Sequence, residues 1–257
     1  LDELVNGHPV LYRVTVPEGL TWWQTGKMLE EAGLVVFEDF RKVVTDPDFL
    51  RHYGIPFATA EGFLMPDTYL LKKNEVIDLA QARAVAGRMV DNFWRKTANV
   101  WPDGKKPGPA QAAQLKTWII LASIVEKETG IDAERARVAG VYQNRINKGM
   151  LLQADPTVIY GLGPNFDGNL RRRDLDDANN LYNTYQRPGL TPGPICSFGA
   201  AALAAAVRPE EHNYLYFVAK FDGGEHVFST NLTDHNKAVR QYLQNRRSAK
   251  PAASDAR

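Results

Sequence analysis

Cysteine is almost absent from this sequence, with Cys196 as the one example among 257 residues. A single cysteine cannot form an internal disulfide or supply a cysteine-based metal cage. The five histidines include no close pair on one predicted helix face, so we expect neither a metal site nor any other cofactor. The cysteine count leaves the compartment open, because a reducing compartment and a disulfide-free periplasmic protein both fit it.

The chain also lacks a charge excess and a long apolar run. It has 31 Lys and Arg against 30 Asp and Glu, a formal net charge of +1, which argues against a nucleic-acid binder. The longest apolar stretch, Trp118–Val125, is far shorter than the roughly 18–20 residues of a membrane span. The acidic start at Leu1 does not resemble a signal peptide. We interpret the abrupt start as that of a chain trimmed of an upstream targeting segment. We therefore expect the chain as given to be soluble.

The overall composition is that of a folded globular protein. Apolar residues make up 44%, charged residues 24% and aromatic residues 10% of the chain. These fractions exclude wholesale disorder and a fibrous repeat. A chain of this length can bury a substantial core, as one large domain or as two smaller ones.

Residues 1–57 have the pattern of a small α/β module. Alternating side chains predict a strand at Tyr12–Val16, followed by a turn. Thr21 is a good N-cap for a helix that ends near Gly33. A second helix is predicted at Phe37–Tyr53.

Residues 58–109 predict a joining segment. It begins with an extended aromatic stretch, Glu61–Tyr69, and continues into a predicted helix at Glu75–Lys96. The loop Asn99–Pro109 follows, and its prolines and glycines indicate an exposed connection between elements.

Residues 110–245 predict a mainly helical domain that also contains a β-hairpin, and residues 246–257 predict a disordered tail. The complete chain is therefore predicted to have an α+β fold. Residues 150–200 are rich in Pro, Gly, Asn and Asp and predict mostly loop. The other expected elements are helices at Ala110–Thr129, Asp132–Lys148 and Gly199–Val207, strands at Tyr214–Ala219 and His226–Ser229 around a turn at Asp222–Gly224, and a last helix capped by Asp234.

One glutamate near the end of the helix at Ala110–Thr129 is the best candidate for catalysis. At about 100° per residue, Glu128 shares a face with Leu121 and Ile124, whereas Glu126 lies on nearly the opposite side. Burial and the negative end of the helix dipole would both raise the pKa of such a carboxyl, as a general acid requires. The alternative is that Glu126 and Glu128 are the solvated end of a helix. They cannot form an acid and nucleophile pair, because residues two apart do not face each other.

Seven sequence blocks, in order along the chain, resemble the endolytic murein transglycosylases, the YceG-like family. They are Glu61–Tyr69, Leu121–Thr129, Leu152–Gly161, Tyr182–Tyr185, Gly189–Ile195, Tyr214–Val218 and Phe228–Asn236.

The resemblance implies lytic cleavage between MurNAc and GlcNAc within peptidoglycan glycan strands, which limits the length of nascent strands. The family's catalytic glutamate corresponds to Glu128, with Glu126 ranked second. One carboxyl would act as acid and then as base, and the C6 hydroxyl would close on C1 to give a 1,6-anhydro-MurNAc end.

Polar and aromatic residues after the catalytic helix are candidates for substrate binding. Amide, hydroxyl and aromatic groups suit hydrogen bonding to sugars and stacking on them, and the alternative for each is a structural turn. The candidates are Gln153, Asp155, Thr157, Asn183 and Tyr185.

Three other features have two interpretations each. The arginines 171–173 lie next to aspartates and indicate a self-compensating surface, or a contact with anionic parts of the wall. Trp22 and Trp23 could stack on glycan, although core packing of at least one is favoured. Asn231, Asp234 and His235 form the third feature: Asp234 is favoured as the N-cap of the last helix, and His235 could lie at the surface or in the site.

The start of the chain loosely resembles a LysM-type module, which would imply glycan binding. The family resemblance further implies a single-pass anchor in the bacterial inner (cytoplasmic) membrane, upstream of this chain, with this domain on the periplasmic or outer side. It implies peptidoglycan synthases as partners and no nucleic acid. Two alternatives stay open: a non-enzymatic peptidoglycan-binding scaffold, and an inverting muramidase with Asp155 as second carboxylate.

Overall fold

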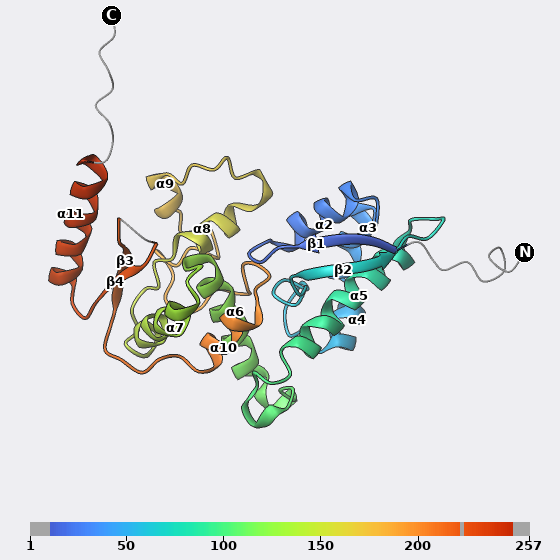
Figure 1. Ribbon diagram of the computed structural model, residues 1–257, viewed down its shortest axis with the longest axis horizontal. Helices are drawn as coiled ribbons and strands as arrows, with labels where there is room; N and C mark the ends of the chain where they lie inside the picture. The colour runs from blue at the N-terminus through green and yellow to red at the C-terminus, as the bar shows by residue number, and fades with distance from the viewer. Residues whose placement is uncertain (1–10, 222–223, 249–257) are drawn as a thin grey trace, which may run out of the picture.

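A two-stranded sheet organises the first half of the chain in the computed structural model, which describes residues 11–221 and 224–248. Strand β1 (Leu11–Val16) pairs antiparallel with β2 (Asp67–Lys72), so that Val14 lies opposite Tyr69. The helices of this half lie around the sheet, on the right in Figure 1. They are α2 (Trp22–Glu31), α3 (Phe37–Val44), α4 (Pro47–Tyr53) and α5 (Leu79–Lys96).

This pairing joins two segments that the sequence analysis assigns to different parts of the chain. β1 belongs to the expected module at 1–57 and β2 to the expected joining segment, and α5 packs against α3. We call residues 11–96 the N-terminal unit for this reason.

Local chemistry explains where its helices begin and end. Thr21 caps α2 as predicted, with its hydroxyl accepting from Gln24 N–H at 3.3 Å. The single helix predicted at Phe37–Tyr53 is wrong, because it is broken before Pro47. Proline lacks an N–H donor and its ring clashes with the preceding turn of a helix. Asp46 caps the new helix instead, accepting from Asp48 N–H at 3.1 Å.

The second half is mainly helical and carries a hairpin, which confirms the α+β prediction. We call residues 112–248 the C-terminal unit. Its elements are α6 (Ala112–Glu128), α7 (Asp132–Asn147), α8 (Asp155–Leu162), α9 (Arg172–Leu175), α10 (Ala200–Val207), β3 (Tyr216–Ala219), β4 (His226–Ser229) and α11 (Leu232–Ser248). Short 3₁₀ turns lie at Pro102–Gly104, Pro109–Gln111 and Gly163–Asn165.

The stretch at 150–200 is mostly loop, as expected, and is interrupted by the short helices α8 and α9. Two other expectations for this half need correction. Asn231, rather than Asp234, caps α11, because Asp234 N–H donates to the Asn231 side chain at 2.9 Å. α11 also continues through Ser248 into the expected tail, whose residues 249–257 lie outside the described part. The expected hairpin turn is likewise described only at Gly224.

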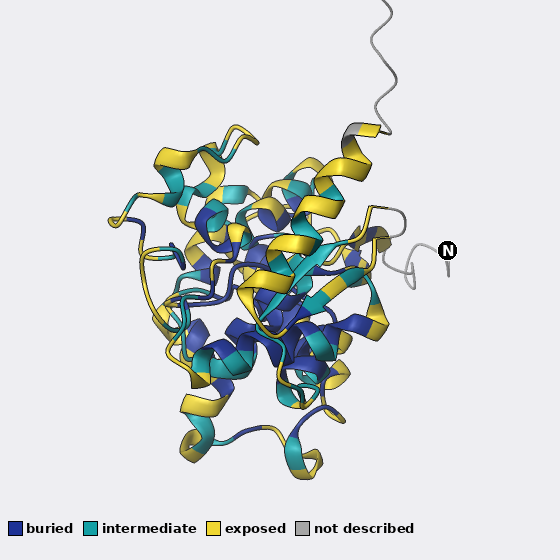
Figure 2. Ribbon diagram, turned by 90° about the vertical axis from the view of Figure 1, so that its left-hand side faces the viewer, coloured by how far each residue is buried: buried dark blue, intermediate teal, exposed yellow. Residues whose placement is uncertain are grey.

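A single cluster of buried side chains runs through both units, from Val14 to Ala206. Figure 2 shows this buried centre, with α11 exposed on the outside. The units also exchange backbone hydrogen bonds, from Gly19 N–H to Ser197 O at 2.8 Å and from Ser197 N–H to Leu20 O at 2.7 Å. The N-terminal unit is therefore packed firmly against the C-terminal unit.

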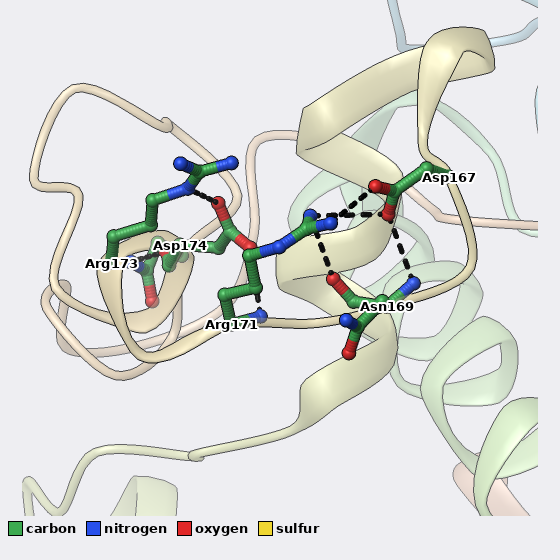
Figure 3. Close-up of polar contacts among 6 residues, drawn as sticks. Asp167, Asn169, Arg171, Arg173 and Asp174 are labelled. Atoms are coloured by element: carbon green, nitrogen blue, oxygen red, sulfur yellow. Dashed lines mark hydrogen bonds and ion pairs between the residues drawn. The ribbon is translucent and has the colours of Figure 1, made fainter.

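Neighbouring aspartates compensate the charges of the arginines at 171–173, and Figure 3 shows the contacts of Arg171 and Arg173. Arg171 pairs with Asp167 at 2.5 Å, and its backbone N–H donates to Asp174 at 2.8 Å. Arg173 lies 3.7 Å from Asp174, and the exposed Arg172 pairs with Asp176 at 2.9 Å. This surface matches the self-compensating interpretation.

Within the two described ranges, no helix has both the length and the apolar character needed to cross a membrane.

Candidate active site

An open pocket of about 400 Å³ lies in the C-terminal unit, where α6, α7, α8, the hairpin and α11 meet. It brings together four of the six predicted site residues, which come from three separate stretches of sequence. The lining residues are Glu128, Tyr142, Arg145, Leu152, Gln153, Asp155, Tyr185, Tyr216, Phe217, Leu232, His235 and Asn236.

Glu128 is the last residue of α6 and lines this pocket, where it is partly buried. Burial raises the pKa of its carboxyl to about 7, and the negative charge of Asp155 acts in the same direction. A hydrogen bond from Tyr142 and the positive charge of Arg145 partly oppose this shift of the pKa. At neutral pH a large fraction of Glu128 is therefore protonated, which is the state that a general acid needs.

Tyr142 and Arg145 project from the same face of α7, three residues apart. Both are buried, with exposed fractions of 2% and 8%. Arg145 donates from Nε to Leu215 O at 2.6 Å and from Nη1 to Leu152 O at 2.7 Å. It thus ties the loop before α8 to the segment that leads into the hairpin, and it brings a positive charge to the pocket.

Asp155 and Tyr185 also line this pocket. The Tyr185 hydroxyl donates to Asp155 Oδ1 at 2.5 Å, and burial together with Asp155 raises the pKa of Tyr185. Gln153 lies beside them with φ of 51°, in the left-handed region that non-glycine residues rarely adopt. Such backbone strain is concentrated at functional sites, and this position leaves the side chain exposed in the pocket.

Thr157 and Asn183, the other two predicted binding residues, do not line this pocket. Both are fully buried and engaged in structural hydrogen bonds. Thr157 donates to Ala154 O at 2.7 Å and shares a hydrogen bond of 2.9 Å with Thr184. The Asn183 amide donates to three backbone carbonyls between residues 174 and 177. Their turn-forming chemistry, the alternative interpretation, explains their positions.

Glu126 points away from the pocket, as the helix geometry of α6 predicts. Its Oε2 accepts from Gly199 N–H at 3.1 Å, and its Oε1 lies 3.9 Å from Arg135. Burial raises the pKa of Glu126 as well, and its nearest carboxyl neighbour is Glu18 of the N-terminal unit. Glu126 therefore belongs to the contact between the units.

Sequence reasoning missed Tyr142 and Arg145. Their spacing from Val138 on the predicted helix, at i, i+4 and i+7, was a usable signal for one buried face. Tyr216, Phe217 and Leu232 were also missed as pocket residues. His235, left open between site and surface, lines the pocket and stacks on Tyr216 with ring centroids 5.2 Å apart.

Comparisons with known proteins give a consistent result. The sequence model of the YceG-like family matches residues 1–241. An endolytic murein transglycosylase of Bacillus subtilis is 33% identical over 209 residues, covering 81% of this chain and 54% of that protein. One from Streptococcus pneumoniae is 26% identical over 275 residues, covering 96% of this chain and 48% of that protein. The chain thus spans about half the length of these relatives.

The fold is also similar to a solved structure. A crystal structure of a putative YceG-like protein from Listeria monocytogenes superposes with a TM-score of 0.71 at 30% sequence identity. The match covers 91% of this chain and 78% of the other.

Proposed function

The chain belongs to the YceG-like family, and from that premise we propose that it is an endolytic lytic transglycosylase that cleaves peptidoglycan between MurNAc and GlcNAc. Glu128 is its acid and base. The observation that carries the proposal is the partly buried carboxyl of Glu128 in an open pocket, with its pKa raised to about 7. The names of the relatives supply the substrate class, because those proteins are described as endolytic murein transglycosylases.

The first step is proton donation. Protonated Glu128 gives its proton to the glycosidic oxygen, and the bond from that oxygen to C1 of MurNAc breaks through an oxocarbenium-like state. The GlcNAc side leaves with a free hydroxyl. The carboxylate of Asp155 lines the same pocket as Glu128, where it would stabilise positive charge developing at C1.

The second step returns the proton. The Glu128 carboxylate takes the proton of the C6 hydroxyl of the same MurNAc, and the C6 oxygen forms a bond to C1. The product carries a 1,6-anhydro ring, Glu128 is protonated again, and no water is consumed. Tyr142 supports this cycle because its hydrogen bond stabilises the carboxylate between the two steps.

Gln153, Asp155 and Tyr185 are the proposed substrate-binding residues. Their amide, carboxylate and phenol groups face the same pocket as Glu128, which supports contacts with acetamido and hydroxyl groups of the sugars. We propose no substrate contact for Thr157 and Asn183, whose polar atoms are engaged inside the protein.

The deciding experiment is mass spectrometry of purified glycan strands after incubation with the wild type, Glu128→Gln and Glu126→Gln. We expect anhydro-MurNAc ends from the wild type and from Glu126→Gln, and none from Glu128→Gln. Glu126 is the matched control, because it lies on the same helix and faces away from the pocket.

Other products would identify the alternatives. Reducing ends would mean a hydrolase, for which Asp155 is the candidate base. Binding to strands without any cleavage would favour the non-enzymatic scaffold. An active Glu128→Gln beside an inactive Glu126→Gln would overturn the assignment of the acid.

We also propose the broader setting that the family resemblance implies. The N-terminal unit, whose sequence loosely resembles a LysM-type module at its start, would position glycan for the C-terminal catalytic unit. In the whole protein a single N-terminal anchor would hold both units on the outer side of the bacterial inner (cytoplasmic) membrane, beside peptidoglycan synthases. The firm packing of the two units supports a positioning role. Co-purification of the membrane-anchored protein with a synthase would test the partnership.

A further inference from the structure

The two adjacent tryptophans at the start of α2 have different environments. Trp22 packs against the buried core and stacks on Phe37 with ring centroids 6.2 Å apart. Trp23 instead lines a pocket of about 380 Å³ and contacts Tyr160 of α8, with centroids 4.9 Å apart. Core packing therefore explains Trp22 and leaves Trp23 unexplained.

This second pocket lies between the N-terminal unit and α8. Its walls combine aromatic rings with polar groups, an arrangement that suits a sugar, which offers an apolar ring face and a rim of hydroxyls. Gln24 and Lys127 are exposed at the pocket. The lining residues are Thr21, Trp23, Gln24, Lys127, Pro156, Ile159, Tyr160, Gly163, Pro164, Phe166 and Ile195.

A buried carboxyl fixes the two walls relative to each other. Glu61 is 1% exposed, and its Oε2 accepts from Trp22 N–H, in the first turn of α2, at 3.0 Å. The same carboxyl interacts with the Tyr160 hydroxyl of α8. The relative position of Trp23 and Tyr160 is thus held by the fold before any ligand arrives.

The second pocket lies next to the proposed active site at two places along the chain. Glu128 lines the first pocket and Lys127 the second; Asp155 lines the first and Pro156 the second. Consecutive α-carbons are about 3.8 Å apart, so the two pockets are close neighbours at the end of α6 and at the start of α8.

We propose that this pocket is a subsite for a further sugar residue of the glycan strand, with Trp23 as its stacking platform. The proposal rests on the proposed function for the identity of the strand. It makes long strands better substrates than short ones, because only a strand that reaches both pockets gains the contact with Trp23.

The test measures cleavage and binding over a length series of glycan oligomers, from two disaccharide units to full strands. For the wild type we expect kcat/KM to rise with length. Trp23→Ala should lower kcat/KM on full strands about tenfold and flatten the rise, whereas Trp23→Phe should keep most of it. Phe221→Ala is the matched control, since Phe221 is an exposed aromatic residue that lines neither of the two pockets.

Binding of full strands to Glu128→Gln, with and without Trp23→Ala, separates this proposal from the proposed function. A loss of affinity on adding Trp23→Ala supports the subsite even if no variant cleaves. Phe166→Ala removes a ring from another element of the pocket and should act in the same direction if Trp23→Ala does not fold. Unchanged affinity and unchanged length dependence in folded Trp23→Ala would overturn the subsite while leaving the activity of Glu128 intact.

Discussion

At the scale of single residues, the groups around Glu128 determine at which pH it carries its proton. The pKa of its carboxyl is raised to about 7, mainly by burial. Because the first chemical step uses the protonated form, we expect kcat/KM to be highest below pH 7 and to fall as the pH rises through about 7. Initial rates of anhydro-product formation between pH 5 and 9 measure this limb.

Two substitutions should move that limb in opposite directions. Tyr142 donates a hydrogen bond that lowers the pKa of Glu128, so Tyr142→Phe should shift the limb to higher pH. Asp155 raises the same pKa by charge repulsion, so Asp155→Asn should shift it to lower pH. Shifts in the same direction, or none, would show that another group controls the profile.

Glu61 offers a second test at this scale, with stability as the readout. Burial raises its pKa from 4.5 to about 8, so its contribution to stability is complete below pH 4.5 and is lost as the pH rises through about 8. Glu61→Gln removes this dependence and can still accept from Trp22 N–H. Across this range the wild type should therefore lose on the order of 1–4 kcal/mol of unfolding free energy relative to the variant.

Urea unfolding of both proteins at pH 4.5, 6 and 8 measures that difference. Glu128 also has a raised pKa, but it is present in both proteins and its contribution cancels. A difference that is constant with pH would contradict the buried, neutral Glu61.

At the scale of elements, segments with helical hydrophobic patterns could be assigned from the sequence, whereas helices inside irregular, Pro- and Gly-rich segments could not. The helix at Ala110–Thr129 was predictable because apolar residues occupy almost all its faces between Trp118 and Val125, and the helical wheel placed Glu128 and Glu126 on nearly opposite faces. The short α8 was hidden among prolines and glycines. Its eight residues form because Asp155 and Pro156 suit a first helical turn and because Thr157 closes on Ala154.

The pocket residues also differ in how far the sequence could predict them. Glu128 could be proposed from the pattern of its own helix, whereas Tyr142 and Arg145 reach the pocket only because α7 packs beside α6. Thr157 and Asn183 were predicted as binding residues because loop polar groups serve turns and ligands alike. Only their burial distinguishes the two uses.

Asn183 should therefore affect folding rather than binding. Its amide donates to two carbonyls at the end of α9 and to one in the loop that follows, and its Oδ1 accepts from Tyr185 N–H at 2.9 Å. We expect Asn183→Ala to lower the unfolding free energy by about 2–4 kcal/mol, because buried carbonyls lose their partner. Asn169→Ala, at an exposed position in the same region, should change it by less than about 0.5 kcal/mol. Equal unfolding midpoints for both variants would contradict this role.

At the scale of the whole molecule, the contact between the units decides whether the N-terminal unit can position glycan. Its centre is buried, where Gly62 packs against Ile119 of α6 and Pro194 of the loop before α10. Backbone hydrogen bonds at Gly19 and Ser197 close the contact nearby. Both pockets therefore lie on one rigid frame.

A matched pair of glycine substitutions tests this contact. Gly62 has φ of 78° and Gly189 has φ of 82°, so an added Cβ costs each about 1–2 kcal/mol of backbone strain. At Gly62 the Cβ would also lie 2.9 Å from Pro194 Cγ and 3.0 Å from Ile119 Cγ2, whereas at Gly189 it meets nothing within 4 Å. Gly62→Ala should thus lower the unfolding free energy by about 1–3 kcal/mol more than Gly189→Ala. It should also weaken binding of full strands to Glu128→Gln, because the second pocket needs both units in register. Equal stability and equal binding for the two glycine variants would mean that the units do not act as one frame.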